Sequence, residues 1–338
     1  MSKDSKLEPT YGNFKVKGVI NQIEEVRTGK TGSGAEYKSL KMTINTDSSG
    51  SVRVDLFGMK EDELEIVKFQ GKNVEKKKVK WAKRNSLEEG WSLSNNRAVR
   101  MGLEVKNAKT KGGLQAYASY DAIDKIVEVF EVGDSVTVEG SMRFSAYENQ
   151  NGDTVTIANY NIQKIYKIAD IDFEDEEFEP YSKFEQTVVI AHTEKVKNEE
   201  NGQNELLVDA IIITDKNGNF VTQAFKVLVE KRKVLAQNLH KLADYSVIPL
   251  KGDIVNRALI DETGTDEDSE WGFDAQQPVI KGFERYFEIL AADGTKIEEG
   301  KYKEDDFLIK DALSEEDGGD AFDNEDDGEG LDDDWLEE

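Results

Sequence analysis

The sequence predicts a mainly β protein whose strands form two small barrels. The first observation is the stretch Val132–Gly152, in which Val136 and Val138 alternate with polar residues as in a half-buried strand. Gly140 interrupts this strand, and a small, strongly coiled barrel needs such a glycine-kinked hairpin to turn its corner. The second observation is that three strands, a helix and two strands are expected in each half of the chain.

The elements of the first half follow from alternating apolar residues and from turn chemistry. Phe14 and Val16 share one face of the first strand, and Gly18 marks a bulge. The expected strands are Phe14–Arg27, Lys38–Thr46, Ser51–Phe57, Val132–Tyr147 and Thr154–Ile168, with a short helix at Asp62–Phe69. An insertion at about 70–131 separates that helix from the fourth strand.

Three blocks of the first half resemble the single-stranded DNA-binding proteins of bacteria and phages. They are Thr31–Asn45 (TGSGAEYKSLKMTIN), Ser51–Glu63 (SVRVDLFGMKEDE) and Val138–Gly152 (VEGSMRFSAYENQNG). In this order they resemble the family's glycine-containing loop before strand two, its third strand and its late hairpin. The resemblance implies that residues 1–170 form a five-stranded OB barrel carrying the insertion.

The resemblance also implies which residues contact DNA. Phe57 and Tyr147 match base-stacking aromatics of the family, and Arg143 lies in the matching late hairpin. Ser51 stands where the family has a third aromatic, so Tyr37, Trp81 or Trp91 could take its place. For Phe57, the alternative is an ordinary core residue.

The insertion is basic, because residues 71–112 contain 12 Lys or Arg and 4 Glu. If KKKVKWAKR is extended, alternate lysines share one face of the strand. The expected phosphate contacts are Lys76, Lys78, Lys80, Lys83 and Arg84, interleaved with Trp81 and Trp91. Cations that track phosphates beside rings that stack bases are typical of single-strand binding surfaces. The alternative is that the tryptophans are buried against the barrel and the lysines form a solvated face.

The second half repeats the order of elements. An acidic linker is expected at 171–183, followed by a second, divergent OB-like domain at 184–303 with a helix at Val229–Ala243. Gly252 takes the role of Gly140 in this repeat. The role of this domain stays open between DNA binding, dimerisation and a longer footprint. Trp271, beside an acidic loop, is expected to pack or to contact protein.

Charge is distributed unevenly along the 338 residues, whose net charge is −26. Residues 304–338 hold 18 acidic residues and one lysine, so this tail is predicted to be disordered. Near its end, acidic residues are followed by an apolar pair and two glutamates, and such a pair suits docking on basic, apolar pockets. The expected docking residues are Asp332, Asp333, Asp334, Trp335 and Leu336. The resemblance implies that this tip recruits replication and recombination proteins; the alternative is a solubilising charge run.

Several functional classes find no support. The chain has no cysteine, so disulfides, thiolate catalysis and cysteine-ligated zinc are excluded. His192 and His240 are interpreted as structural, and no carboxylates fall in an acid–base or metal spacing. We therefore expect no enzyme activity, no cofactor and no metal. Without an apolar run at the start or of membrane-spanning length, a cytoplasmic protein is expected.

These observations predict a sequence-nonspecific single-stranded DNA-binding protein, with a phage source. It would coat and protect single strands through the first barrel and its insertion, and bring partners through its tail. Homo-oligomerisation, footprint and preference for RNA or DNA stay open. The rival prediction is an OB-based assembly or virion protein whose acidic tail solubilises it or mimics DNA.

Overall fold

A computed structural model describes residues 7–70, 73–94, 97–104, 113–198, 202–261 and 279–308. The first half contains β1 (Gly12–Ile23), β2 (Arg27–Lys30), β3 (Glu36–Asn45), β4 (Ser51–Met59), β5 (Glu63–Gln70), β6 (Asn73–Lys80), a 3-10 turn (Trp81–Lys83), β7 (Ser92–Leu93), β8 (Ala98–Gly102), β9 (Gln115–Ala118), α1 (Ser119–Val129), β10 (Ser135–Glu148) and β11 (Thr154–Lys167). The second half contains β12 (Tyr181–Lys197), β13 (Asn204–Ile213), β14 (Phe220–Leu228), α2 (Val229–His240), β15 (Val247–Asp261), β16 (Val279–Ala292), a 3-10 turn (Gly294–Lys296) and α3 (Asp305–Leu308).

Ten of the 13 strands described in the large sheet pair in two closed rings of five. The first ring runs β1–β3–β4–β11–β10 and returns to β1, and the second runs β12–β13–β14–β16–β15 and returns to β12. In each ring the third and fifth strands pair in parallel, and all other neighbours are antiparallel. The mainly β class predicted from the sequence is thus confirmed. The assignment of both rings to OB-type barrels stays a prediction.

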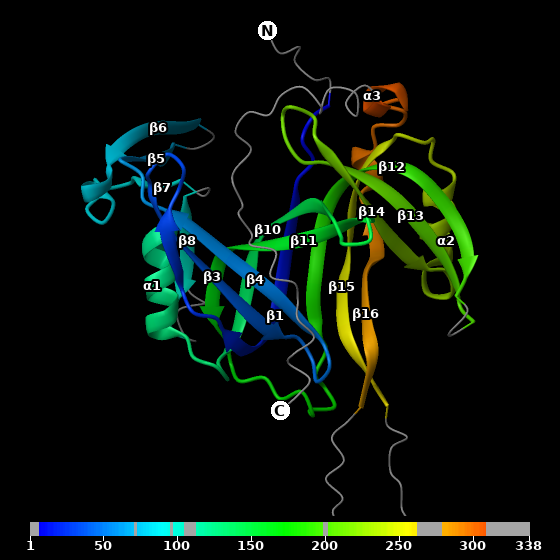
Figure 1. Cartoon of the computed structure of the whole chain (residues 1–338), viewed down its shortest axis with the longest axis horizontal. Helices are drawn as coiled ribbons and strands as arrows, with labels where there is room; N and C mark the ends of the chain where they lie inside the picture. Colours follow the sequence, from blue (N-terminus) through cyan, green and yellow to red (C-terminus); the bar gives the residue numbers. More distant parts are fainter. Residues whose placement is uncertain are drawn as a thin grey trace, which may run out of the picture.

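The two rings join through an antiparallel ladder between β1 and β12, which runs through the middle of the molecule (Figure 1). Phe14 stands opposite Phe184 in this ladder. Gly12 stands opposite Gln186 and Val16 opposite Ser182, so the pairing is symmetric about the two phenylalanines. The first strands of the two rings are therefore related by a local two-fold axis.

Two glycines hold equivalent corners of the rings. Gly140 pairs with Phe14, Gly252 pairs with Phe184, and each glycine lies at a register shift in its hairpin. A Cβ at Gly140 would lie 1.8 Å from the Asn161 carbonyl oxygen, and one at Gly252 would lie 1.8 Å from the Glu288 carbonyl oxygen. No side chain fits at either corner, which agrees with the predicted equivalence of the two glycines.

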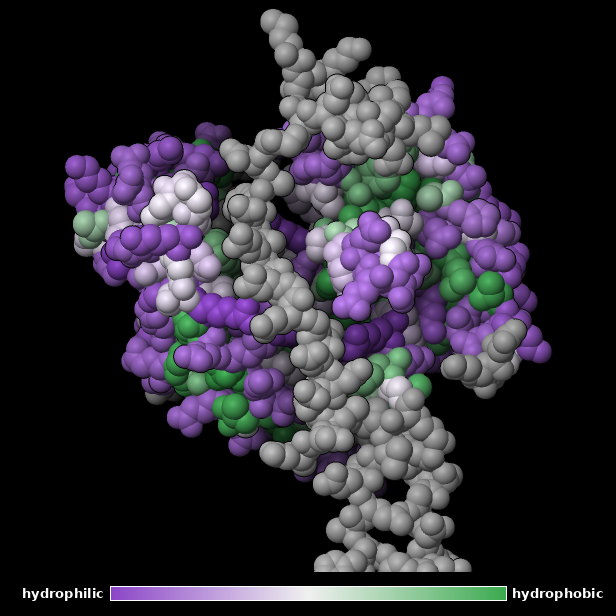
Figure 2. All heavy atoms as spheres, viewed as in Figure 1, coloured by the Kyte–Doolittle hydropathy of each residue, from purple (hydrophilic) through white to green (hydrophobic). Residues whose placement is uncertain are grey.

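A single hydrophobic core runs through both rings. Val16, Ile44 and Val138 are fully buried in the first ring, and Leu206 and Phe225 are buried in the second. Each fully buried side chain of this size contributes about 1.5–3 kcal/mol relative to its exposed state. Hydrophilic side chains cover most of the described surface in the view of Figure 2, with small separate apolar areas.

The helix expected at Asp62–Phe69 is wrong, because this segment is strand β5. Leu64 and Ile66 are buried while Glu63 and Glu65 face outward, which is the alternation of a strand. β5 pairs with β6 and β7 in a separate three-stranded sheet. The helix of the first ring is α1, which lies at the end of the insertion and packs against β4.

The structure also moves two expected boundaries. β12 already begins at Tyr181, so the acidic linker ends at Pro180. Phe307 in α3 is 5% exposed and packs against Tyr245 and Tyr302, so the ordered chain continues into the first residues of the expected tail. The rest of that tail, with its tip, and Trp271 lie outside the residues that the structure describes.

Candidate nucleic-acid interface

The first ring presents an outer face on β3 and β4. Strand side chains alternate, so the neighbours of buried Leu40, Met42, Val54 and Leu56 point away from the core. The register places Tyr37 opposite Met59, Ser39 opposite Phe57, Lys41 opposite Asp55 and Thr43 opposite Arg53. This arrangement puts aromatic side chains at one end of the face and charged side chains beside them.

An exposed aromatic pair lies at that end. The rings of Tyr37 and Phe57 stack with their centroids 5.4 Å apart and their planes 29° apart. Gly29 of β2 packs against the Tyr37 ring, since a Cβ there would lie 2.7 Å from it. Phe57 is 42% exposed, so it is not a core residue. Gly29 thus supports the Tyr37 ring, and the Phe57 ring stays open to solvent.

Three cations surround the carboxylate of Asp55 on the same face. Burial raises the pKa of Asp55, while a hydrogen bond from Asn161 Nδ2 at 3.3 Å and the charges of Lys41, Arg143 and Arg53 lower it. Lys41 lies on β3, Arg53 on β4 and Arg143 on β10, and the order of strands in this part of the ring is β3–β4–β11–β10. Arg53 is also ion-paired with Glu24, at 2.5 Å, so the patch holds three cations and two carboxylates.

The hairpin of β10 and β11 extends this face. Arg143, Ser145 and Tyr147 alternate with Met142 and Phe144, whose side chains are buried. Across the hairpin, Asn159 stands opposite Arg143 and Ile157 opposite Ser145. Tyr147 is 50% exposed near the tip. The outer face includes Tyr37, Lys41, Arg53, Phe57, Arg143, Tyr147, Ile157, Asn159 and Asn161.

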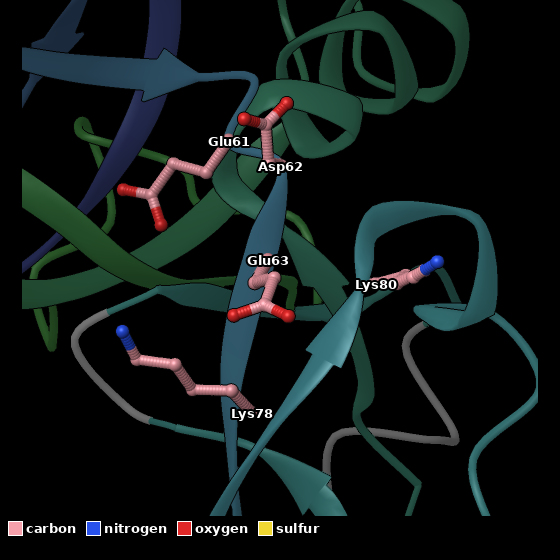
Figure 3. Close-up of a pocket in the computed structure, with 5 residues that line it drawn as sticks. All are labelled: Glu61, Asp62, Glu63, Lys78 and Lys80. Carbon is pink, nitrogen blue, oxygen red and sulfur yellow. The ribbon is translucent and has the colours of Figure 1, made fainter.

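The basic strand of the insertion is extended, as the sequence predicts. Lys76, Lys78 and Lys80 share the exposed face of β6. Their partners on β5 are Val67, Glu65 and Glu63, and the Lys76 ammonium lies 3.3 Å from a Glu65 carboxylate oxygen. In Figure 3 the Lys78 and Lys80 side chains flank Glu63, in a hollow that Glu61 and Asp62 also line. Neighbouring carboxylates therefore offset much of the positive charge of this strand.

The two tryptophans of the insertion are half-buried. The Trp81 ring meets Tyr120 of α1 edge to face at 5.9 Å, and the Arg84 guanidinium lies 4.4 Å from the Trp81 ring. Arg84 also donates two hydrogen bonds to Asp121, at 2.5 and 3.1 Å. The Lys77 ammonium lies 4.2 Å from the ring of Trp91.

These contacts tie the tryptophans and Arg84 into the packing between the small sheet and α1. Lys83 stays exposed in the 3-10 turn. A role of these residues in DNA binding stays a prediction.

Several residues of the outer face are absent from the set expected from the sequence. Lys41, Arg53, Ile157, Asn159 and Asn161 occupy outward positions of strands whose inward positions are apolar. That alternation is the signal that could have found Lys41 and Arg53. The pairing of β4 with β11, which brings Asn161 to Asp55 across 106 residues of sequence, leaves no local signal.

The second ring is different at the equivalent place. The Lys226 ammonium lies 3.4 Å from the centre of the Tyr286 ring and 3.3 Å from a Glu205 carboxylate oxygen. Burial, together with the charges of Glu284 and Glu288, raises the pKa of Tyr286 to about 12. The cation and the ring are thus engaged with each other and with neighbouring carboxylates.

Within the described ranges, no three His, Cys, Asp or Glu side chains come together as a metal site. None of the helices in these ranges is long and apolar enough to cross a membrane.

Fold and site together define a β protein of two strand rings with one exposed aromatic and basic face. The chain belongs to the YorF family, whose model matches residues 11–320. Two solved structures of the single-stranded DNA-binding protein from Thermus aquaticus, the wild type and a deletion mutant, are similar to the chain at 10% identity and a TM-score of 0.37. Each match covers 84% of this chain, with 91% of the wild-type chain and 94% of the mutant chain. A likeness at this level establishes neither fold nor function. A search of curated proteins gave no match.

Proposed function

We propose that this protein binds single-stranded nucleic acid, and single-stranded DNA in particular, through the outer face of an OB-type barrel. The observation that carries the proposal is the Phe57 ring, which stacks on Tyr37 and is half exposed on the same face as Lys41, Arg53 and Arg143. The pairing order of each ring, strand one to two to three to five to four and back to one, supports the assignment of both to OB-type barrels.

The chemistry of the face suits single strands of any sequence. A base that stacks on Phe57 or Tyr147 gains about 1–3 kcal/mol, and any base can do so because every base has a flat face. Arg53 lies four residues from Phe57 along β4, about 13 Å. A single strand of nucleic acid can therefore stack a base on the Phe57 side chain and place a phosphate at the Arg53 guanidinium. We infer little sequence preference, because these contacts use the faces of bases and the backbone.

The aromatic platform is tested with a labelled oligo-dT and fluorescence anisotropy. Phe57→Ala should weaken binding about 5- to 140-fold, the equivalent of the 1–3 kcal/mol of one stacked base. Phe69→Ala is the matched control, because Phe69 is 60% exposed on β5, outside the outer face. Equal effects of the two variants, or no binding of oligo-dT by the parent protein in dilute buffer, would contradict the proposal. Oligo-rU in parallel measures the preference between DNA and RNA.

A second candidate function is protein–protein assembly. Phe69 and Val74 stand opposite each other at the end of the β5–β6 hairpin, 60% and 47% exposed. An exposed apolar hairpin end of this kind suits a protein contact. Under this alternative, Phe69→Ala would change the assembly state of the protein measured by light scattering, and Phe57→Ala would not.

Recruitment of replication or recombination proteins by Asp332–Leu336 is the finer part of the proposal. It is supported by the sequence of the tip, acidic residues followed by Trp335 and Leu336. A peptide of the last 16 residues, immobilised and exposed to purified candidate proteins, tests it. A Trp335→Ala, Leu336→Ala peptide that captures the same proteins equally well would contradict it.

A further inference from the structure

A groove of 420 Å³ lies in the second unit, between helix α2 and strands β12 and β13. Its apolar lining consists of Leu206 of β13 and Val229 and Ala236 of α2, of which Leu206 and Ala236 are buried and Val229 is half-buried. Lys195 and Lys197 of β12 and Lys233 of α2 stand at its edges. In Figure 1, α2 lies on the opposite side of the molecule from α1, so this groove is separate from the first ring. Its size falls in the range of sites that hold small ligands or short peptide tips, about 300–1,000 Å³.

The groove has uncompensated positive charge. Lys195, Lys197 and Lys233 are exposed, and among the residues that the structure describes none of them pairs with a carboxylate. Two carboxylates, Glu205 in the lining of the groove and Glu230 on α2, are already engaged. Glu205 accepts from Lys226 at 3.3 Å and from Asn198 at 3.1 Å, and Glu230 accepts from the backbone and side chain of Asn204 at 2.9 Å. An apolar floor with three free cations at its rim fits an acidic peptide that carries an apolar side chain.

We propose that the groove binds the C-terminal tip of the same chain, with Trp335 and Leu336 on the apolar lining and Asp332–Asp334 beside the lysines. Residues 309–338 contain 15 acidic residues and one lysine, so their charge is complementary to the rim of the groove. The tip is the place in this segment where three consecutive acidic residues are followed by two adjacent large apolar ones. This inference is independent of DNA binding by the outer face.

The chain geometry allows the tip to reach the groove. Phe307 packs in one cluster with Ile211 of β13, and Leu206 lies five residues further along that strand, about 17 Å away. The 26 residues between Leu308 and Trp335 span up to about 90 Å when extended. An intramolecular ligand on such a tether has a local concentration in the millimolar range. A groove of modest affinity is then occupied by the tip of its own chain.

The absence of cysteine makes a cross-linking test direct. In the full chain, Gln237→Cys places a thiol at the groove, and Glu337→Cys places one next to the tip. Mild oxidation should join them within one chain, which mass spectrometry of the linked peptides identifies. The control pair is Lys216→Cys with Glu337→Cys. Lys216 is exposed in the turn before Phe220, whose ring contacts Phe307 where the tail begins, so random collision favours the control.

Charge reversal separates the groove from the outer face. Lys195→Glu with Lys233→Glu should lower the yield of the Gln237–Glu337 cross-link at least fivefold. Arg53→Glu with Arg143→Glu on the outer face should leave it unchanged. Circular dichroism checks that each variant is folded. Equal yields for the two cysteine pairs, a cross-linked dimer in place of the monomeric product, or a yield that only the outer-face variant lowers would overturn the proposal. None of these readouts uses DNA, so they stand apart from the fate of the proposed DNA binding.

Discussion

The salt dependence of DNA binding measures how many cations of this protein contact phosphates. The outer face offers three, Lys41, Arg53 and Arg143, around Asp55. Each phosphate contact on a single strand contributes about −0.7 to the slope of the logarithm of the binding constant against the logarithm of the salt concentration. Three contacts predict a slope of about −2.1, or roughly an 18-fold loss of affinity between 50 and 200 mM salt.

The same slope tests the insertion. If Lys76, Lys78 and Lys80 also contact phosphates, six contacts predict a slope of about −4.2 and roughly a 300-fold loss over that salt range. The ion pair of Lys76 with Glu65 and the carboxylates beside Lys78 and Lys80 favour the smaller value. The assay is a titration of labelled oligo-dT at five or more salt concentrations.

Single variants assign the slope to the outer face. Arg143→Gln should reduce its magnitude by about 0.7, to about −1.4. Lys125→Gln is the matched control, because Lys125 on α1 pairs with Glu128 away from the outer face, and it should leave the slope unchanged. A slope that Arg143→Gln does not change, or that both variants reduce equally, would refute phosphate contact at the outer face.

Three further outcomes are expected. Gly140→Ala should lower the free energy of unfolding by about 1–3 kcal/mol, because its Cβ would collide with the Asn161 carbonyl, whereas Gly282→Ala meets no atom within 4 Å and should not; denaturant melts measure both. Burial raises the pKa of Asp55, so its negative charge is lost as the pH falls from neutral through that pKa, and the affinity for oligo-dT should rise. Asp55→Asn should bind oligo-dT more tightly at neutral pH and lose this pH dependence. Parallel affinity–pH profiles of the parent and the variant would refute this role of Asp55. Deletion of 314–338 should tighten DNA binding most at low salt, where an acidic segment competes best, and equal affinities across a salt titration would disprove this competition.

Local patterns in the sequence are enough to predict most strands. Val136 and Val138, which alternate with the polar residues Thr137 and Glu139, indicate β10, and the apolar run of β13 indicates a strand as well. The prediction for Asp62–Phe69 fails because Leu64, Ile66 and Val67 fit both a short helix and a strand. Pairing with β6 and β7 stabilises this segment as a strand. That pairing depends on the tertiary structure, so the local sequence does not reveal it. The buried residues Ala122, Ile123 and Ile126 of α1 have helical spacing, but they lie in the insertion, for which no helix is predicted from the sequence.

The candidate site divides along the same line. Phe57 and Tyr147 can be found from the sequence because they lie in blocks with a family resemblance, and the structure shows both aromatic side chains exposed. Asp55 and Asn161 meet only because β4 and β11 pair in parallel. The groove unites Lys195 of β12 with Lys233 of α2, 38 positions apart in a chain rich in lysine. No spacing rule would have selected that pair.

The two rings share a frame but not a surface. The β1–β12 ladder makes Phe14 equivalent to Phe184. Ile162 is equivalent to Ile289, because Ile162 pairs with Gly140 and Ile289 pairs with the equivalent glycine, Gly252.

The same registers place Lys226 where the first ring has Asp55, and Leu228 where it has Phe57. Leu228 is only 7% exposed and leads directly into α2, so it offers no ring on which a base could stack. A nucleic acid that follows the aromatic and basic side chains is therefore confined to the first ring, within the described parts of the chain. The second ring, with its basic groove, is then available for the C-terminal tip while DNA is bound.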